Sequence, residues 1–474
     1  MQARNQVNDV QVAYEKLRRA QVAVPFPSAE EREDRLTRLE RLLTRRRDDF
    51  VRAISDDFGT RARAETLSAD VLVTLDGVRH ARRHLRDWMQ RRPVSPHPFF
   101  RPSRAFIEYL PKGVVGVIAP WNYPVNLALG PLAGALAAGN RCLVKPSELT
   151  PRTSSLLAES VAEAFTAEEV AVVEGGADVA QAVTRLPLDA LLFTGSTHVG
   201  RLVAKAAADN LVPVTLELGG KSPALVHASY ELEKAADRIA AGKLFNGGQT
   251  CIAPDYALVP AGTERAFVAA LARAVSRMYP RLEGFTSIAS DKAYGRLQAL
   301  VADARSKGAE VVELGALGKA GRVMTPVALL GVTEAMTVMQ EEIFGPVLPV
   351  ETYATLDDAV ARISARPRPL AFYYFDDDAS RADDVLRRVT SGGACVNDTL
   401  VHFAQENLPF GGVGPSGMGA YHGRTGFETF SHARSVLVSS PLSPARQMLK
   451  PPFGRLVETS LELLISGARQ LLGR

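Results

Sequence analysis

The chain has 474 residues, 46% of them hydrophobic and 23% charged, and its formal net charge is +4. A chain of this length forms two or three structural units, because one hydrophobic core rarely extends beyond roughly 250–300 residues. The small net charge gives no general attraction for nucleic acid, and no apolar run reaches the roughly 18 residues that a membrane span requires. These properties favour a globular enzyme over a nucleic-acid-binding or membrane-spanning protein.

The three cysteines, Cys142, Cys251 and Cys395, lie far apart in the sequence. They form no CxxC pair, and with the scattered histidines they give no zinc-ligand spacing, so no metal site is expected. A sparse, odd set of cysteines is typical of a reducing compartment. The amino terminus has no apolar signal core, and we therefore expect a cytoplasmic protein.

Residues 7–92 are predicted to be helical, because apolar residues recur there at helical spacing. Ser28 followed by Glu31 predicts a capping box at the start of one of these helices. The segment 79–104 then holds eight arginines against one acid, Asp87. It could face an anion, but a solvated helix face is favoured, because no aromatic stacking pattern accompanies the charges.

Short β-branched runs bounded by glycine and proline then alternate with helical segments. The expected strands cover residues 105–110, 113–120, 141–145, 170–174, 190–194 and 214–218, and the expected helices cover residues 125–138, 153–165, 178–184 and 198–208. Strands separated by helices of this length predict right-handed βαβ units and a doubly wound sheet. Such a sheet binds ligands beyond the carboxyl ends of its strands.

A second α/β unit is expected to begin around Glu217, without a linker, and to continue to about residue 396. Its helical patterns cover residues 231–245, 263–277 and 291–306. The stretch 397–416 has the composition of a loop. The last twenty residues form an amphipathic pattern that includes Leu456, Leu461 and Leu464.

The stretch Phe245–Cys251, with the sequence FNGGQTC, places one cysteine on a glycine-rich turn. A helical segment leads into this turn, and a strand-like run, residues 256–259, leaves it. Loops between regular elements often carry chemistry, and glycine permits backbone angles that other residues avoid. Taken alone, however, Cys251 is more often a small buried apolar side chain.

Other motifs also leave alternatives open. Gly195 and Ser196 end a strand and open a helix, which suits either a phosphate site or a plain tight turn. Glu217, at a strand end, is either paired with a cation or kept for proton transfer. Asn122 is either a turn cap or an amide donor. The run 412–417 fits GxGxxG, but it lacks the flanking strand and helix and is expected to be a structural loop.

Together the motifs resemble the aldehyde dehydrogenase superfamily over residues 10–440. The resemblance rests on Pro120–Pro124 (PWNYP), Lys145–Glu148 (KPSE), Phe193–Ser196 (FTGS), Leu216–Lys221 (LELGGK), Gly248–Cys251 (GQTC), Glu341–Pro346 (EEIFGP) and Leu408–Gly412 (LPFGG), in the order of the family. Cys251–Tyr256 and Ser416–Gly419 resemble the class 3 branch. The tail Pro451–Gly454 is similar to that of bacterial coniferyl aldehyde dehydrogenases.

The resemblance implies an α/β, aldehyde dehydrogenase-like fold with two doubly wound domains and a small oligomerisation segment. A Rossmann-type NAD(P)-binding domain would comprise residues 1–90 and 111–217, and a catalytic domain residues 218–399. Residues 91–110 and 400–440 would form bridging and oligomerisation segments, followed by the tail 441–474 with its amphipathic helix. A homodimer is implied. The tail helix is expected to dock on a partner subunit, with contact to a membrane surface as the alternative.

The resemblance also implies roles for individual residues. Cys251 would be the nucleophile, Glu217 the general base that activates water, and the Asn122 side chain and the Cys251 backbone N–H the oxyanion donors. Residues expected to contact the cofactor are Trp121, Lys145, Glu148, Gly195, Ser196, Gly200, Glu342 and Phe344. A carboxylate at Glu148 favours NAD, with NADP left open.

The implied reaction is the oxidation of an apolar aldehyde to its carboxylic acid through a thiohemiacetal and a thioester. Tyr123, Phe403 and Phe410 would line a substrate tunnel suited to aromatic aldehydes, such as coniferyl aldehyde, or to fatty aldehydes. Two alternatives remain: an enzyme that passes the acyl group to coenzyme A, and a catalytically silent binding or structural homologue. Glu217 argues against the first, since coenzyme A transfer needs no water-activating base.

Overall fold

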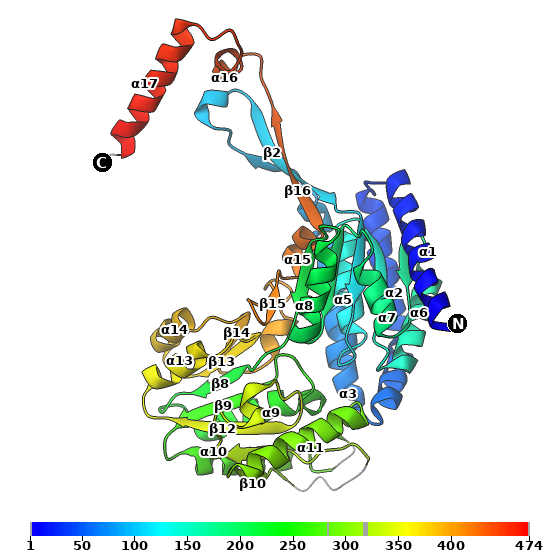
Figure 1. The fold of residues 1–474 in the computed structure, drawn as a ribbon, viewed down its shortest axis with the longest axis vertical. Helices are drawn as coiled ribbons and strands as arrows, with labels where there is room; N and C mark the ends of the chain where they lie inside the picture. Colours follow the sequence, from blue (N-terminus) through cyan, green and yellow to red (C-terminus); the bar gives the residue numbers. More distant parts are fainter. Residues whose placement is uncertain (1, 282–283, 316–320, 473–474) are drawn as a thin grey trace.

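The computed structural model describes residues 2–281, 284–315 and 321–472. Two α/β units lie against each other, and a long arm leaves the first unit and carries the C-terminal helix (Figure 1). The predicted α/β class with two doubly wound sheets is confirmed. The strands and helices predicted between residues 105 and 218 are all present.

Helices cover the amino-terminal segment, as predicted. They are α1 (Gln2–Ala23), α2 (Ala29–Phe58), α3 (Arg63–Thr66), the π-helical turn η1 (Leu67–Leu72) and α4 (Val73–Trp88). The capping box is confirmed: the Ser28 hydroxyl accepts from the Glu31 N–H at 3.2 Å, and the Glu31 carboxylate accepts from the Ser28 N–H at 2.6 Å. Arg79 on α4 pairs with Glu40 on α2 at 2.8 Å, and Arg86 makes similar surface pairs. The arginine-rich face is thus a solvated helix face.

The first sheet has six strands in the order β15-β7-β6-β3-β4-β5. Its strands are β3 (Val114–Ile118), β4 (Arg141–Lys145), β5 (Val170–Val172), β6 (Ala190–Thr194), β7 (Val214–Glu217) and the short β15 (Gly417–Met418), and its helices are α5 (Asn126–Ala137), α6 (Pro151–Ala164), α7 (Ala177–Thr184) and α8 (Thr197–Ala208). Strands β3 to β7 are parallel, and β15 pairs antiparallel with β7. The strand order reverses between β3 and β6, which is where such sheets bind ligands.

Alternate residues of β3 enter different cores. Val115 and Val117 pack with α2, α4, α5 and α6, whereas Val114 and Ile118 face the side that carries α1, α7 and α8. Side chains alternate across a strand, and a strand covered on both faces must be apolar throughout. This explains why β3 has no polar side chain.

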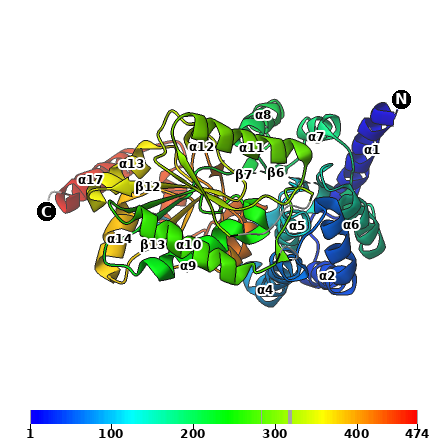
Figure 2. The same cartoon turned by 90° about the horizontal axis from the view of Figure 1, so that it is seen from below.

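The second sheet has seven strands in the order β10-β11-β12-β9-β8-β13-β14. The strands are β8 (Pro223–Val226), β9 (Tyr256–Pro260), β10 (Glu310–Glu313), β11 (Val327–Leu330), β12 (Val347–Tyr353), β13 (Ala371–Phe375) and β14 (Gly393–Val396); the helices are α9 (Leu232–Leu244), α10 (Glu264–Met278), α11 (Asp291–Ser306), α12 (Thr337–Gln340), α13 (Leu356–Ala365) and α14 (Ala379–Arg388). Figure 2 shows α9 and α10 on one side of these strands and α11 and α12 on the other. The loop that carries Cys251 precedes β9, so it lies at the amino end of that strand.

The arm is an antiparallel sheet of three strands in the order β1-β2-β16, formed by β1 (Arg92–Val94), β2 (Arg104–Pro111) and β16 (Ser431–Val438). It carries a 3-10 turn η2 (Pro98–Phe100), α16 (Pro444–Met448) and α17 (Arg455–Leu472) at its far end. The helix predicted in the tail is present. No helix in the described part of the chain is both long and apolar enough to cross a membrane.

Residues 400–440 contain several elements that lie in different parts of the molecule. The turn η5 (Val401–Ala404) lies beside the active-site cavity, and α15 (Gly423–Thr429) packs on α4 and α5. Residues 412–416 of the GxGxxG run form a loop, as predicted, whereas Gly417 begins β15, and the glycines of the run serve close packing. A Cβ on Gly412 would lie 2.1 Å from the Ser416 carbonyl oxygen, and one on Gly417 would lie 2.4 Å from the Leu216 carbonyl oxygen.

Candidate active site

The loop that carries Cys251 is held in a conformation that needs its two glycines. Gly247 and Gly248 have φ angles of 60° and 79°, and such left-handed angles favour glycine. A Cβ on Gly248 would lie 2.4 Å from the Gly345 carbonyl oxygen. The Gln249 side chain fixes the other end of the loop, because its amide donates to the Ser287 carbonyl oxygen at 3.0 Å. The thiol of Cys251 is therefore presented from a tightly packed turn.

Asn122, on the turn after β3, lies against this loop. Its side-chain Nδ2 donates to the Gln249 carbonyl oxygen at 3.1 Å, and its own carbonyl oxygen accepts from Asn246 Nδ2 at 3.0 Å. A primary amide carries two N–H groups, so one remains after the bond to Gln249. The amide is thus buried next to the Cys251 turn, and it joins the two α/β units.

Glu217 ends β7, and both of its carboxylate oxygens are buried without a hydrogen-bond partner in the described part of the chain. The predicted alternative, a structural ion pair, is therefore wrong for the described residues. Burial raises the pKa of Glu217 well above its usual range.

Cys251 lies close enough to two carboxyls for their charges to act on it. Burial raises the pKa of the Cys251 thiol, and the nearby Glu342 and Glu217 raise it further. A base must remove the thiol proton before the sulfur attacks a carbonyl carbon.

The residues predicted to meet a dinucleotide surround the carboxyl ends of β3 and β6. Trp121 and Phe344 form an edge-to-face pair with ring centroids 5.5 Å apart. At the end of β4, Lys145 Nζ bonds the Glu148 carboxylate at 2.6 Å. Ser196 caps α8 by accepting from the Val199 N–H at 3.3 Å. The amino end of α8, with its partial positive charge, therefore lies directly after the carboxyl end of β6.

Two predicted cofactor glycines are needed for packing in this structure. A Cβ on Gly195 would lie 2.5 Å from the Phe193 ring, and one on Gly200 would lie 2.6 Å from the Leu218 side chain. Gly200 therefore allows α8 to approach the segment after β7 closely. A contact of Gly200 with the cofactor stays a prediction.

The surroundings of the Glu342 carboxylate indicate whether a polar ligand fits beside it. Its Oε1 is buried and unpartnered among the described residues, and its carboxylate lies over Gly219, where a Cβ would be 2.2 Å away. Burial, aided by Asp255, raises the pKa of Glu342 to about 8. An unsatisfied buried carboxyl fits a ligand that brings hydroxyl donors, such as a ribose.

A cavity of about 410 Å³ has Cys251 among its lining residues. Its walls are mainly apolar and include Tyr123 and Phe403. The Phe410 ring packs edge-on against Phe403, with centroids 4.7 Å apart, and Phe410 is not among the lining residues. Contact of these three residues with a substrate stays a prediction.

Three further residues of the site were not predicted from the sequence. Arg238 lines the cavity and lies 3.8 Å from the Asp398 carboxylate. Lys243 has a buried Nζ without a partner in the described ranges, and burial lowers its pKa to about 8. Tyr421 is buried near Glu217 and Cys251, whose charges add to the effect of burial in raising its pKa. Only Lys243 carried a usable signal, a lysine between small and apolar residues near a helix end.

Comparisons with known proteins also indicate an aldehyde dehydrogenase. The model of the "Aldehyde dehydrogenase family" matches residues 2–436. A probable coniferyl aldehyde dehydrogenase of Pseudomonas aeruginosa is 48% identical over 96% of both chains, and a coniferyl aldehyde dehydrogenase of a Pseudomonas species is 44% identical over 96% of both. Aldehyde dehydrogenase family 3 member B1 of Rattus norvegicus is 39% identical over 93% of this chain and 94% of its own.

Solved structures agree with these relatives. The substrate-bound state of Staphylococcus aureus AldH matches with a TM-score of 0.87 and 36% identity, covering 91% of this chain and 94% of that one. An indole-3-acetaldehyde dehydrogenase in complex with NAD+ matches with a TM-score of 0.85 and 26% identity, covering 92% and 89%. The predicted family resemblance is confirmed, because the family model, the relatives and the solved structures agree. The chain belongs to the aldehyde dehydrogenase family and is an NAD(P)-dependent oxidoreductase.

Proposed function

We propose that this protein oxidises an apolar aldehyde to its carboxylic acid, with Cys251 as nucleophile, Glu217 as general base and Asn122 as oxyanion donor. The observation that carries the proposal is the buried, unpartnered carboxyl of Glu217 within electrostatic range of the Cys251 thiol. An enzyme that hands its acyl group to coenzyme A has no use for such a base. Product analysis with and without coenzyme A tests this, because acid must form without it.

The chain's own residues account for the steps around the substrate carbon. Once deprotonated, the Cys251 sulfur adds to the aldehyde carbon, and the second amide N–H of Asn122 with the Cys251 backbone N–H stabilises the oxyanion. The bound dinucleotide supplies the hydride acceptor. Glu217 then takes a proton from the water that attacks the resulting thioester.

Asn122→Ala should reduce the rate of thioester formation by about 10²–10³-fold, because one oxyanion donor is lost. Single-turnover measurements of the acylation step check this. Because the same amide bonds the Gln249 carbonyl oxygen, the control is the alkylation rate of Cys251 by iodoacetamide. An unchanged alkylation rate with slowed acylation supports the donor role, and an unchanged acylation rate contradicts it.

We propose that the first α/β unit holds the dinucleotide, with Trp121 and Phe344 beside the nicotinamide and Glu342 on its ribose. Gly195 and Ser196 would lie beside the pyrophosphate at the amino end of α8. Lys145 and Glu148 would meet the adenosine ribose. The Glu148 carboxylate, which accepts from Lys145 Nζ at 2.6 Å, would then lie beside the 2′-phosphate of NADP and repel it, so NAD is favoured.

Glu148→Ala should raise the ratio of kcat/KM for NADP to that for NAD by about tenfold or more, because a like-charge contact is removed. Glu159→Ala, which removes an exposed carboxylate on α6, is the matched control and should leave the ratio unchanged. An unaltered ratio in the Glu148 variant would show that another group selects the cofactor.

We propose an aromatic aldehyde with a polar group at its far end as the preferred substrate. Arg238 and Asp398 are the charged residues in the otherwise mainly apolar lining that also includes Cys251, and they would hydrogen-bond a phenol hydroxyl of the substrate. The Pseudomonas relatives named for coniferyl aldehyde support this class. Fatty aldehydes are the alternative, and a panel of aromatic and aliphatic aldehydes separates the two.

Arg238→Met should lower kcat/KM for a 4-hydroxylated cinnamaldehyde by about tenfold relative to cinnamaldehyde, the loss expected for one charged hydrogen bond. The matched control is Arg277→Met, which removes a neighbouring surface arginine paired with Asp237 and should alter neither substrate. If both aldehydes lose the same factor, Arg238 has no part in specificity.

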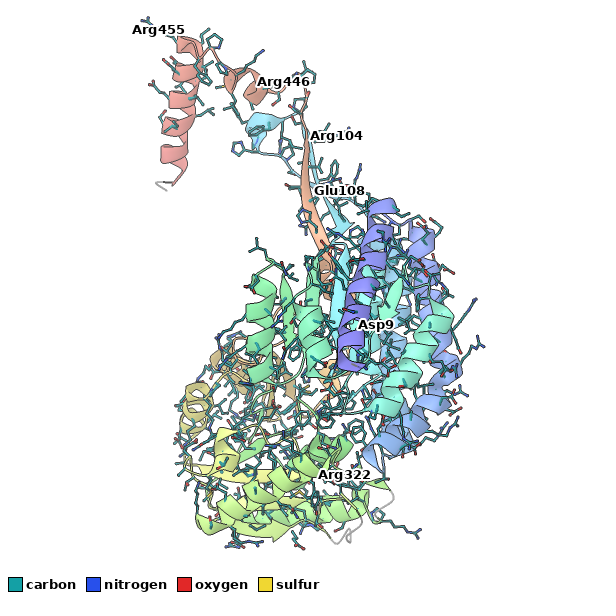
Figure 3. The ribbon with its side chains drawn as sticks, turned by 45° about the vertical axis from the view of Figure 1, so that its right-hand side comes forward. Asp9, Arg104, Glu108, Arg322, Arg446 and Arg455 are labelled. Atoms are coloured by element: carbon teal, nitrogen blue, oxygen red, sulfur yellow. The ribbon has the colours of Figure 1, made fainter. Side chains whose placement is uncertain are left out.

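We further propose a homodimer formed through the arm. Strand β16 is an edge strand, and an exposed edge with apolar side chains pairs readily with another strand. Leu437 is 49% exposed there, and Leu456 on α17 is 85% exposed. Figure 3 shows the charged side chains of Arg104 and Glu108 on the same arm.

The tail helix α17 is proposed to dock on the second subunit rather than on a membrane. Its sequence has few basic residues to attract anionic lipid: only Arg455, Arg469 and Arg474 lie in that stretch. Light scattering and flotation with anionic vesicles, each on the full chain and on a chain ending at residue 440, test this. Vesicle binding that depends on the tail would overturn the choice. The three free thiols are consistent with the proposed cytoplasmic location.

A further inference from the structure

Residues 338–345, the cofactor loop, carry Glu342 and Phe344, which meet the dinucleotide if the proposed function holds. Phe344 has a φ angle of 53°, a left-handed conformation that is uncommon for a residue other than glycine. Such a conformation persists only where the surrounding structure fixes it. The contacts that hold the cofactor loop therefore decide where its two functional side chains lie.

Lys221 reaches the cofactor loop from the segment that follows β7. Its ammonium group donates to the Val338 carbonyl oxygen at 2.8 Å and to the Glu341 carbonyl oxygen at 3.0 Å. It also donates to the Asp255 carboxylate. An ammonium group has three N–H donors, so each of them has a partner. The side chain is 11% exposed, and the lysine is thus a buried connection between two segments and the loop.

Asp255 reaches the same loop from the segment that follows Cys251. One of its carboxylate oxygens accepts from Lys221, and the other accepts from the Ile343 N–H at 2.9 Å. The Asp255 side chain is 5% exposed, and a buried charge needs a partner of opposite charge. Ile343 lies directly before Phe344, so this carboxylate fixes the backbone at the strained position.

Arg296, on α11, holds the same stretch of backbone. Its guanidinium donates to the Glu342 carbonyl oxygen at 3.2 Å and also to the Ile343 carbonyl oxygen. The same helix packs closely on the end of the loop, where a Cβ on Gly345 would lie 2.4 Å from the Leu297 side chain. The backbone of the cofactor loop is therefore bonded by three charged side chains.

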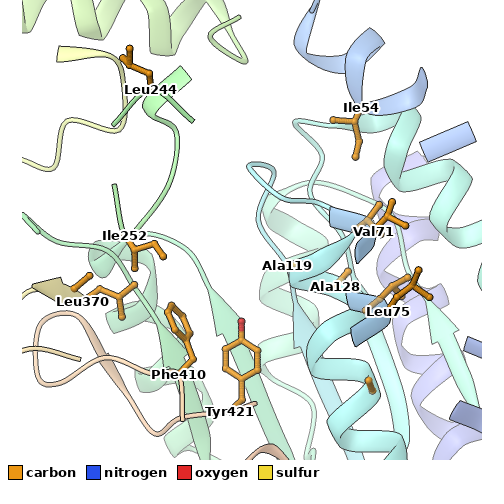
Figure 4. Close-up of a cluster of buried hydrophobic side chains, with 14 of the residues drawn as sticks. Ile54, Val71, Leu75, Ala119, Ala128, Leu244, Ile252, Leu370, Phe410 and Tyr421 are labelled. Atoms are coloured by element: carbon orange, nitrogen blue, oxygen red, sulfur yellow. The ribbon is translucent and has the colours of Figure 1, made fainter. Parts of the chain in front are cut away.

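Other contacts fix the proposed nucleophile and base. The Asp255 N–H donates to the Ser222 carbonyl oxygen at 2.7 Å, a backbone bond that needs neither side chain of the ion pair. Strand β7, which ends at Glu217, pairs with β6 and β15. Figure 4 shows Ile252, the residue after Cys251, among the buried apolar side chains of one core cluster. Loss of the ion pair should therefore release the cofactor loop and leave these two segments in place.

We propose that Lys221, Asp255 and Arg296 are positioning residues that act through the cofactor loop. They hold Glu342 and Phe344 in the conformation that meets the dinucleotide. They have no part in nucleophilic attack or in thioester hydrolysis. Their loss should weaken the reaction that needs the dinucleotide and spare a reaction that does not.

The test compares NAD-dependent oxidation of an aromatic aldehyde with hydrolysis of p-nitrophenyl acetate by the enzyme without dinucleotide. In Lys221→Met/Asp255→Asn, kcat/KM for NAD should fall at least about tenfold, whereas the KM for the aldehyde and the steady rate of ester hydrolysis should stay within about twofold of wild type. Both charges are removed together, because one alone would stay buried and unpaired. Rates are counted per p-nitrophenolate released in the initial burst, so unfolded protein does not contribute.

Arg296→Met tests the same role without altering the buried ion pair. The arginine side chain is 39% exposed, so the fold should tolerate its loss. The variant should show the same separation of the two reactions, and the Kd for NADH from fluorescence titration should rise about two- to tenfold, as for the loss of one hydrogen bond. Arg305→Met, which removes an exposed arginine of the same helix, is the matched control and should change neither reaction.

Two results would overturn the positioning role. Equal losses in oxidation and in ester hydrolysis would do so, because a general structural effect moves both reactions. Wild-type oxidation and NADH affinity in either the double variant or Arg296→Met would also do so.

Failure of this proposal is distinguishable from failure of the proposed function. If Glu342→Gln and Phe344→Ala both bind NADH with the wild-type Kd, the cofactor loop does not meet the dinucleotide and the proposed cofactor site is wrong. If these two variants lose affinity while the double variant and Arg296→Met keep it, the cofactor site stands and only the positioning role is wrong.

Discussion

Cys251→Ala should abolish aldehyde oxidation, with a fall in kcat of at least about 10⁴-fold, because no other group can form the covalent intermediate. The half-buried Cys251 opens onto the 410 Å³ cavity, whereas Cys142 is fully buried and burial raises the pKa of its thiol to about 12. Steady-state oxidation of an aromatic aldehyde measures the effect. Cys395→Ala is the matched control, since it removes another half-buried thiol outside the cavity lining.

The alkylation rate of the Cys251 thiol should increase with pH. Burial and the two nearby carboxyls raise the pKa of Cys251, and the reactive thiolate forms only as the pH rises toward that pKa. Alkylation by iodoacetamide should therefore be slow at neutral pH and accelerate steadily above it. Rapid alkylation at pH 6 would mean that the thiolate is stabilised by a cation that this geometry does not provide.

Glu217→Gln should slow thioester hydrolysis by about 10²–10⁴-fold while leaving acylation nearly intact, because an amide cannot accept the proton of the attacking water. The acyl-enzyme should then accumulate, and burst kinetics with limiting aldehyde measure it. The matched control is Glu174→Gln, an exposed carboxylate bonded to Ser155. If acylation and hydrolysis fall together, Glu217 acts before the thioester forms.

The pH dependence of hydrolysis follows from the same carboxyl. Burial raises the pKa of Glu217, and its ionised form is the base. The hydrolysis rate should therefore fall as the pH decreases through the raised pKa, at values where an ordinary glutamate is still ionised. A rate that stays flat down to pH 5 would contradict a buried base.

The fold was predictable because its signals are local. The βαβ series of the first unit shows in the alternation of short apolar strands, such as residues 190–194, with helices. The turn of Cys251 was predictable because its glycines are needed for backbone angles and close packing. The motifs that resemble the family added the roles of Asn122 and Glu217, which spacing alone left open.

The features of the site that could not be predicted depend on contacts between segments far apart in the sequence. The packing of the Phe410 ring against Phe403 depends on the chain folding back at Tyr421. Arg238 enters the cavity from α9, and nothing near it in the sequence marks that position. The buried state of Lys243 likewise results from packing of α9 against the second sheet. Such side chains become functional candidates only when the tertiary structure is known.

One measurement tests the central chemistry most directly. Glu217→Gln is mixed with dinucleotide and an aromatic aldehyde, quenched in acid within the burst, digested and analysed by mass spectrometry. The account predicts one acyl group, with the mass of the oxidised aldehyde, on the peptide that contains Cys251. An acyl group on another residue, or none while NADH is formed, would contradict it.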